Sequence, residues 1–347
     1  MSDLNDTARA LVAPGKGLLA ADESTPTITK RFQAVGLPCT EETRRAYREM
    51  LFTTPNLGDA ISGVILFDET IRQNTKDGTP FLEILHQQDI IPGIKVDKGA
   101  KPLARFPGEK VTEGLDGLRE RLEEYARMGA RFTKWRAVIR IGDNLPTHIG
   151  LAANAHALVR FAAQSQELGM VPIVEPEVLM DGNNTIQRCG EITEAIVRLL
   201  FRELAGHRVA LEQMLLKVNM VISGKDCQQQ ASPLEVAEAT LRCLRRVVPP
   251  AVPGILFLSG GQDEVLATQH LNLINQINNV PWELSFSFGR ALQSAALKAW
   301  HGSDVRAGHQ ALLHRADCNG AARYGYYSEA MEQAKEHPLS EVITLAT

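Results

Sequence analysis

Eight short apolar runs, separated by longer segments of helical periodicity, constrain the fold of this chain more than any other feature. They occupy residues 17–21, 61–67, 90–96, 130–139, 170–174, 214–218, 254–258 and 284–288. Each run is short for a helix and typical of a buried strand. Strands that alternate with helices over 347 residues, with no block of strands alone, predict parallel strands closed into one (β/α)8 barrel, a TIM barrel of the α/β class.

The segments between the runs carry helix signals. One segment keeps apolar residues three or four positions apart and ends at Gly129, where a C-terminal cap belongs: Leu115, Leu118, Leu122, Tyr125 and Met128. Another begins with a capping box at Ser232 and Glu235, with proline at the first helical position, and ends before Pro249. An open doubly wound sheet is disfavoured, because no GxGxxG follows the first run.

We expect a single domain over residues 1–347 with a C-terminal tail over 319–347. From about Asn319 the alternation is lost, and Gly320, Gly325 and three tyrosines follow. We expect this tail to pack over the mouth of the barrel.

Charge and composition exclude several classes of function. A net charge of −4 provides no basic field for a nucleic acid or an anionic membrane. Five scattered cysteines without a CxxC pair, and histidines without ligand spacing, favour reduced thiols and no metal. The acidic amino end is unlike a signal peptide, and no apolar run approaches the ~18 residues of a membrane span. These features predict a cytoplasmic protein without a cofactor.

Lys217 is the first candidate for chemistry. An apolar run stops on this amine, so we expect it at the carboxyl end of a barrel strand, where such enzymes keep their active sites. Taken alone, a lysine at this place could equally lie along apolar surface with its ammonium in water.

Charged or glycine-bearing residues follow most of the other strands. In strand order they are Asp22 to Thr25, Lys95 to Lys98, Lys134 to Arg136, Glu175 to Glu177, Ser259 to Gly261 and Ser287 to Arg290. Each has a structural alternative: Asp22 as a helix cap, Glu175 in a solvated turn and Trp135 in packing. Their convergence on one end of the barrel favours a functional site.

The residue types predict imine chemistry. A second ammonium, Lys134, makes Lys217 easier to deprotonate in a desolvated cavity, so that the amine can attack a carbonyl. Glu175 can move protons while the iminium forms, and the iminium then accepts electrons from a breaking carbon–carbon bond. Asp22 is the candidate base for a hydroxyl proton.

Two anion sites are expected. Ser259, Gly260 and Gly261 offer backbone amides, and Gly289 with Arg290 begins a helix that adds its dipole and a guanidinium. A second cationic group, Lys95 with Arg31 and Arg44, lies on early segments across the mouth. This arrangement suggests a small ligand with a phosphate at each end.

These residues resemble those of the class I fructose-1,6-bisphosphate aldolases, the Schiff-base type without metal. The resemblance runs through nearly the whole chain, in the strings APGKG (13–17), LAADEST (19–25), GIKVDKG (93–99), KWR (134–136), VEPE (174–177), LLK (215–217), VPPAVPG (248–254), FLSGGQ (257–262) and GRALQ (289–293).

The resemblance implies a TIM barrel that cleaves fructose 1,6-bisphosphate reversibly in glycolysis and gluconeogenesis. It implies Lys217 as the Schiff-base lysine, Glu175 as proton donor and acceptor and Asp22 at the C4 hydroxyl, supported by Lys134 and Glu177. The implied C1 phosphate ligands are Ser259, Gly260, Gly261, Ser287, Gly289 and Arg290. The C6 phosphate would lie near Ser24, Thr27, Lys95 and Arg31, and the substrate-binding set also includes Arg44 and Arg136. It further implies a homotetramer.

Departures from the family leave alternatives. Val218 replaces a proline and Phe288 a tyrosine, and the chain ends in Leu345-Ala346-Thr347, where animal members have a tyrosine that assists proton exchange. A transaldolase or deoxy-sugar aldolase would share the imine but need fewer phosphate sites. A non-catalytic binding protein on the same scaffold is the alternative from another class. A metal-dependent aldolase is disfavoured by the histidine spacing.

Overall fold

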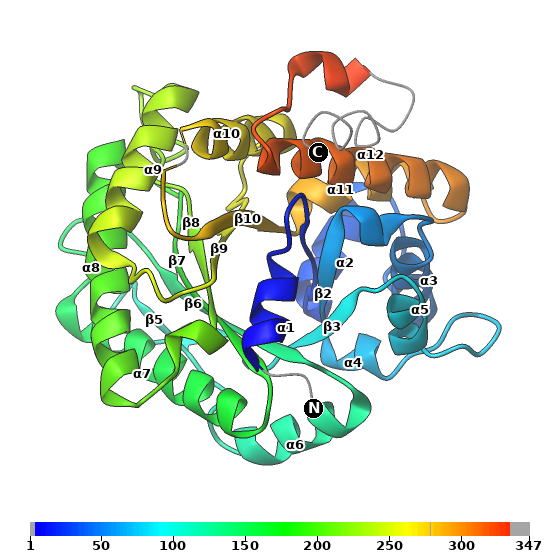
Figure 1. Ribbon diagram of the computed structural model, residues 1–347, viewed down its shortest axis with the longest axis horizontal. Helices are drawn as coiled ribbons and strands as arrows, with labels where there is room; N and C mark the ends of the chain where they lie inside the picture. Colours follow the sequence, from blue (N-terminus) through cyan, green and yellow to red (C-terminus); the bar gives the residue numbers. More distant parts are fainter. Residues whose placement is uncertain (1–3, 278, 334–347) are drawn as a thin grey trace.

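The computed structural model describes residues 4–277 and 279–333, in which eight parallel strands close into a barrel (Figure 1). The strand order is β1-β10-β9-β8-β7-β6-β3-β2. The strands are β1 (Gly17–Ala21), β2 (Ile61–Leu66), β3 (Ile91–Lys95), β6 (Phe132–Ile139), β7 (Val171–Val178), β8 (Leu215–Asn219), β9 (Gly254–Leu258) and β10 (Glu283–Phe288). The predicted fold class and all eight predicted strands are confirmed, and β7 differs most because it runs on to Val178.

Helices surround the barrel (Figure 1). They are α1 (Leu4–Leu11), α2 (Thr25–Ala34), α3 (Glu41–Phe52), α4 (Asp68–Ile71), α5 (Phe81–Gln87), α6 (Leu118–Met128), α7 (His148–Glu167), α8 (Ile186–Gly206), α9 (Pro233–Val247), α10 (Glu264–Gln276), α11 (Arg290–Trp300) and α12 (Val305–Arg323). Short 3-10 helices are η1 (Leu57–Asp59), η2 (Leu211–Gln213) and η3 (Glu329–Gln333). None of the helices in the described part of the chain is long and apolar enough to cross a membrane.

Both predicted helix signals are confirmed. Gly129 follows α6 with φ of 109°, a conformation that favours glycine. At the start of α9 the Ser232 side chain accepts a hydrogen bond from the Glu235 amide, and the Glu235 carboxylate accepts one from the Ser232 amide at 2.8 Å. These caps fix where α6 ends and α9 begins. After α6 ends at Met128, β6 begins at Phe132.

The interior of the barrel changes from apolar to polar along each strand. Side chains toward the amino ends form a buried inner cluster, to which α1 adds Ala8 and Leu11; from the strands it includes Leu18, Ala20, Ile65, Phe132, Val171, Ile173, Leu215 and Leu256. Two residues further along, the same faces of β6, β7 and β8 carry Lys134, Glu175 and Lys217, because side chains on one face of a strand recur every second residue. The apolar half of the barrel interior, at the amino ends of the strands, thus lies beneath the charged half at their carboxyl ends.

Two parts of the described structure differ from the predictions. A two-stranded antiparallel sheet of β4 (Ala100–Pro102) and β5 (Lys110–Thr112) was not predicted, since three-residue strands are too short to show an alternation. The tail does not begin at Asn319, because that residue lies inside α12.

The described part of the tail contacts the outer helices. Gln276 of α10 donates a hydrogen bond to the Gly325 carbonyl at 2.8 Å, and Arg315 of α12 binds Glu332 of η3. Residues 334–347, which include the end of the chain, lie outside the described residues. Packing of the tail over the mouth therefore stays a prediction.

Gly93 of β3 provides a test of the packing below the site. A methyl group built on Gly93 would lie 2.3 Å from the ring of Phe132, which is fully buried. We therefore expect Gly93→Ala to lower the free energy of unfolding by about 1–3 kcal/mol, measured by urea denaturation.

Gly206→Ala is the matched control. Gly206 ends α8 and has no neighbour within 4 Å of a built methyl group. Alanine there should be neutral or stabilising by up to about 1 kcal/mol. Equal unfolding midpoints for the two variants would contradict tight packing around Gly93.

Candidate active site

A cavity of about 590 Å³ opens at the carboxyl ends of the barrel strands. Nearly every predicted site residue lines it, together with Glu23, Lys30 and Asp97, which the sequence reasoning did not select. The predicted residues that line it are Asp22, Ser24, Thr27, Arg31, Lys95, Lys134, Arg136, Glu175, Glu177, Lys217, Ser259, Gly260, Ser287, Gly289 and Arg290.

Two amines and two carboxylates alternate at the floor of the cavity. Lys217 Nζ lies 3.2 Å from Glu175 Oε1, and Lys134 Nζ lies 3.0 Å from Glu175 Oε2. Lys134 Nζ also donates to Asp22 Oδ2 at 2.8 Å. The side chains of the two lysines and Glu175 are at most 4% exposed. Buried charges of this kind are tolerated because each has an opposite partner.

The register of neighbouring strands produces this contact. Val174 of β7 pairs with Leu216 of β8, so Glu175 and Lys217, one residue further on, lie side by side. Arg136 of β6 pairs with Glu175, so Lys134 lies two residues earlier on the same face as Arg136. Trp135, between them in sequence, points outward and stacks on Phe161 of α7, which is the packing role weighed for it above.

The two buried lysines have opposite pKa shifts. Burial, helped by the charge of Lys134, lowers the pKa of Lys217 below its ordinary value, although Glu175 and Asp22 oppose this shift. Burial also disfavours the charged form of Lys134, but the charges of Asp22 and Glu175 outweigh it and raise the pKa of Lys134. Lys217 is therefore the amine that can lose its proton.

The two carboxylates stay ionised despite their burial. Burial raises the pKa of Asp22, but the charges of Lys134 and Lys217 outweigh that effect and lower the pKa overall. The same two ammonium groups lower the pKa of Glu175 in the same way. Both groups can therefore accept a proton from a ligand.

A second buried pair holds the loop after β1. Glu23 accepts a hydrogen bond from Arg48 of α3 at 2.5 Å and another from Gln293 of α11 at 2.9 Å. Gln293 also donates to the Ala20 carbonyl at 2.7 Å. These contacts fix the backbone on both sides of Asp22. The string LAADEST contains Glu23, but nothing in the sequence shows that its partners come from α3 and α11.

Three cations at the mouth are already paired with carboxylates. Lys95 Nζ lies 2.8 Å from Asp97 Oδ1, and the other oxygen of Asp97 accepts from the amide of Arg136 at 3.2 Å. The Arg136 guanidinium pairs with Glu177, and Arg31 pairs with Glu23. These three cationic groups therefore lie in the cavity, each with a fixed counter-charge.

The ends of β9 and β10 are arranged to hold an anion. Gly260 has φ of 58°, which turns the backbone after Ser259, and Gly289 precedes the first turn of α11. Arg290 has no ion-pair partner within residues 4–277 and 279–333, and burial, with Arg31 nearby, lowers its pKa. The buried Ser287 hydroxyl also lacks a hydrogen-bond partner among these residues. An anion would supply partners for both groups.

Arg44 was assigned to the substrate site wrongly. Its guanidinium donates to both carboxylate oxygens of Glu69, at 2.7 and 2.6 Å, and it does not line the cavity. Arg44 lies on α3 and Glu69 on α4, so a contact between two helices holds the side chain away from the mouth.

Two other predicted residues are placed differently from the prediction. Arg31 was grouped with Lys95, but a methyl group built on Gly289 would lie 3.7 Å from its Nη2, so it lies on the β10 side. Gly261 is not part of the cavity lining, yet a methyl group built on it would lie 2.7 Å from Arg290 Nη2. A side chain at position 261 would displace the guanidinium.

The lining contains no histidine or cysteine, the ligands that zinc and similar metals favour. Its carboxylates Asp22, Glu23, Asp97, Glu175 and Glu177 each contact a lysine or arginine. Within the described chain this cavity is built for an anion rather than for a cation.

Comparisons with known proteins give the family. A family model described as "Fructose-bisphosphate aldolase class-I" matches residues 3–342. The chain is 59% identical over 329 residues to "Probable fructose-bisphosphate aldolase class 1" of Xanthomonas campestris pv. campestris, covering 94% of this chain and 98% of that protein. The chain belongs to the class I fructose-bisphosphate aldolase family.

More distant relatives agree. "Fructose-bisphosphate aldolase" of Dictyostelium discoideum is 50% identical over 331 residues, which cover 94% of this chain and 93% of that protein. The solved structure of Plasmodium falciparum fructose-bisphosphate aldolase, in complex with TRAP and a small-molecule inhibitor, superposes with a TM-score of 0.92 at 47% identity, covering 94% of this chain and 95% of that one. The predicted family, fold and function, a fructose-bisphosphate aldolase and thus a lyase, are confirmed.

The charge of Lys134 provides a test of the aldolase site. Only a neutral amine attacks a carbonyl, so we expect the rate of imine formation to rise as the pH passes upward through the pKa of Lys217. Lys134→Met removes an ammonium that lowers this pKa. We expect the acid limb of imine formation to move to higher pH and cleavage to fall by about 10²-fold or more.

The acid side of the pH profile is measured by borohydride trapping of the imine at a series of pH values. Lys134→Arg keeps a positive charge and should leave the limb close to its original position. If Lys134→Met and the unchanged protein have the same acid limb in their pH profiles, Lys134 does not control the pKa of Lys217.

Proposed function

We propose that this chain cleaves fructose 1,6-bisphosphate reversibly to dihydroxyacetone phosphate and glyceraldehyde 3-phosphate through an imine on Lys217. The observation that carries the proposal is the contact between Lys217 Nζ and Glu175 Oε1, at 3.2 Å, in a buried site beside a second ammonium. A buried amine with a lowered pKa and a carboxylate in hydrogen-bond reach is the equipment that imine formation requires.

The proposed reaction uses the groups of the floor in sequence. Glu175 takes a proton from Lys217, neutral Lys217 attacks the C2 carbonyl of the open-chain ketose, and Glu175 returns the proton with which the C2 oxygen leaves as water. Asp22 then takes the C4 hydroxyl proton, and the electron pair of the C3–C4 bond moves into the iminium as the aldehyde forms. Asp22 then loses this proton to solvent, the enamine gains a proton at C3 from solvent, and hydrolysis of the iminium releases the ketone and restores Lys217. Lys134 stays protonated between Asp22 and Glu175 and stabilises both carboxylates.

Two phosphate positions complete the proposal. The C1 phosphate would be held by the amides and hydroxyls at the ends of β9 and β10 with the Arg290 guanidinium. The C6 phosphate would lie near Lys95 and the two hydroxyls of Ser24 and Thr27, whose oxygens are 3.2 Å apart. Arg31 lies beside Gly289, so we assign it to the C1 side.

The alternatives make different predictions. A transaldolase or deoxy-sugar aldolase would keep its turnover on substrates that lack one phosphate. A non-catalytic sugar-phosphate binder would bind without forming an imine. Because Lys217 contacts Glu175 directly and Lys134 joins Glu175 to Asp22, the aldolase is favoured over the binder.

Location and assembly complete the proposal. We place the enzyme in glycolysis in the cytoplasm, supported by the five cysteines, all of which are free. One relative, from Chlamydomonas reinhardtii, is named chloroplastic. A homotetramer rests on the family resemblance alone.

The nucleophile is tested by Lys217→Met. This change removes only the amine, so the barrel should stay folded by circular dichroism while cleavage falls by at least about 10⁴-fold. Borohydride reduction in the presence of dihydroxyacetone phosphate should label Lys217 of the unchanged protein, located by peptide mass mapping. No label should form in Lys217→Met.

Lys225→Met is the control, because Lys225 is exposed, pairs with Asp181 and does not line the cavity. It should keep both cleavage and labelling. A labelled peptide elsewhere in the chain, or substantial cleavage by Lys217→Met, would remove Lys217 from the mechanism. Binding of the ketone without any label would favour the non-catalytic binder.

The C1 phosphate site is tested by Arg290→Ala, made in the Lys217→Met background so that fructose 1,6-bisphosphate is not consumed. Loss of a charged hydrogen bond should weaken binding by about 1.5–3 kcal/mol in calorimetric titration. Arg44→Ala in the same background is the control, because Arg44 pairs with Glu69 outside the cavity and its loss should leave the Kd unchanged. Equal Kd values for both variants would place the phosphate elsewhere.

A further inference from the structure

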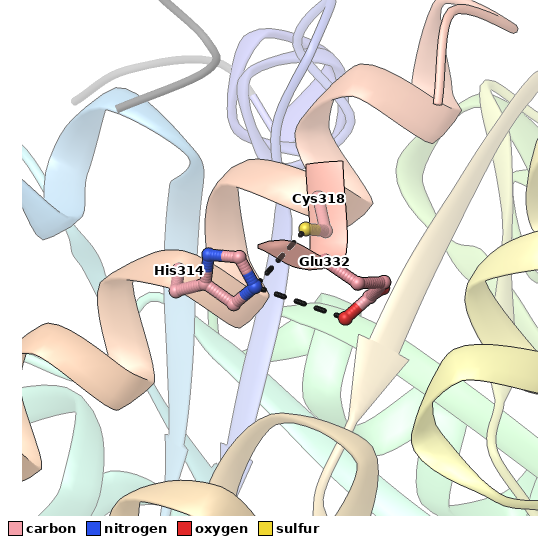
Figure 2. A group of neighbouring side chains, drawn as sticks. All are labelled: His314, Cys318 and Glu332. Carbon is pink, nitrogen blue, oxygen red and sulfur yellow. Dashed lines mark hydrogen bonds and ion pairs between the residues drawn. The ribbon is translucent and has the colours of Figure 1, made fainter. Parts of the chain in front are cut away.

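Three potential metal ligands meet on the outer side of the barrel, away from the cavity (Figure 2). His314 and Cys318 lie on α12 four residues apart, which puts both on one face of the helix, and Glu332 comes from η3. His314 Nε2 is 3.8 Å from Cys318 Sγ and 3.7 Å from Glu332 Oε2. All three ligand atoms lie within 4.8 Å of one another. None of the three residues lines the strand-end cavity.

These distances are close to those of a zinc site. With Zn–S near 2.3 Å and Zn–N near 2.0 Å, tetrahedral ligands lie about 3.5 Å apart for sulfur and nitrogen and about 3.3 Å apart for nitrogen and oxygen. The two distances from His314 exceed these values by only a few tenths of an ångström. A shift of about 1 Å at Glu332, which is on a short 3-10 helix, would bring all three atoms to coordination distance.

The surroundings of Glu332 match the outer shell that metal-binding carboxylates have. Oε2 lies 3.7 Å from His314 Nε2 and also accepts from Arg315 Nη1 at 2.5 Å, while Oε1 accepts from Tyr327 Oη at 2.7 Å and from Arg315 Nη1 at 2.7 Å. Hydrogen bonds of this kind orient a ligating carboxylate, and a metal at Oε2 would share that oxygen with Arg315.

The ligand types select the metal. A thiolate and an imidazole disfavour Mg²⁺ and Ca²⁺, which prefer oxygen ligands, and favour zinc or its neighbours in the first transition row. Cys318 is fully buried, whereas the side chains of His314 and Glu332 are 26% and 18% exposed, so a cation and one water can enter from the solvent side.

We propose that His314, Cys318 and Glu332 bind one Zn²⁺ per chain, with a water molecule as the fourth ligand. The thiol loses its proton to solvent when the metal binds, and no electron transfer is involved. Because two ligands come from α12 and the third from η3, the ion links the segment before residue 334 to the helix. The site is therefore structural and separate from the aldol chemistry on Lys217.

Cobalt provides the probe, since Co²⁺ occupies zinc sites and a thiolate bound to it gives an absorption band in the near ultraviolet. The metal-stripped full-length protein should bind one equivalent of Co²⁺ with this band, and added Zn²⁺ should displace it. Zn²⁺ should also raise the Tm by mass action on the folded state. Proteolysis near Glu332 should slow when Zn²⁺ is bound.

Three variants and two controls define the ligands. Cys318→Ser should abolish the thiolate band, and His314→Gln and Glu332→Gln should each weaken Zn²⁺ binding by at least about tenfold. His309→Gln, on the same helix but bonded to Thr53, and Cys243→Ser, a buried thiol on α9, should bind as the unchanged protein does.

The proposal is overturned if the folded protein binds no stoichiometric Co²⁺ or Zn²⁺, or if Cys318→Ser binds with unchanged affinity. In that case Glu332 serves only its ion pairs with Arg315 and His314. If Cys318→Ser does not fold, the test passes to His314→Gln and Glu332→Gln. Unchanged Zn²⁺ affinity in these two variants would then overturn the proposal. Borohydride labelling of Lys217 should be equal with Zn²⁺ and with chelator, so failure of the zinc site would leave the aldolase assignment intact.

Discussion

The alternation of two ammonium and two carboxylate groups at the floor of the barrel is the interaction on which the active site depends. Asp22, Lys134, Glu175 and Lys217 come from four different strands or strand ends, and each contacts a group of opposite charge. An unpaired charge at this depth would cost several kcal/mol, so each group is buried at a lower cost when its partners are present. The four positions are therefore determined together, and the register of β6, β7 and β8 is what brings them into contact.

The geometry of this network also separates the roles of two chemically identical side chains. Lys134 lies between two carboxylates, whereas Glu175 is the one carboxylate of the described residues that pairs with Lys217, which also carries the repulsion of Lys134. The same burial therefore leaves one amine permanently charged and the other able to deprotonate. The two lysines are thus distinguished by the number of carboxylate neighbours, which is set by the strand order rather than by residue type.

The fold and most of the residues that line the cavity could be predicted because both depend on local patterns. Apolar runs give the strands, and barrel topology brings all their carboxyl ends to one cavity, whatever their separation in sequence. Arg44 was misplaced because its partner, Glu69, lies on another helix and nothing in the sequence links the two. Asn319 was taken for tail because α12 packs against α3, α10 and α11, so its apolar residues do not form a single stripe. The pair His314 and Cys318 has helical ligand spacing, but the third ligand comes from a segment that only the fold brings near.

Ligand selection at the mouth follows from how its cations are paired. A chain with a net charge of −4 attracts a sugar bisphosphate only through local groups, and Glu23, Asp97 and Glu177 already hold Arg31, Lys95 and Arg136. These carboxylates keep the cations ordered before a ligand arrives, which lowers the entropic cost of binding, but an incoming anion must compete with them. A dianionic phosphate competes better than a single carboxylate or hydroxyl. Arg290, which has no carboxylate partner among the described residues, offers its full charge to the first phosphate. The cavity should therefore discriminate by the number and spacing of phosphates more than by the sugar between them.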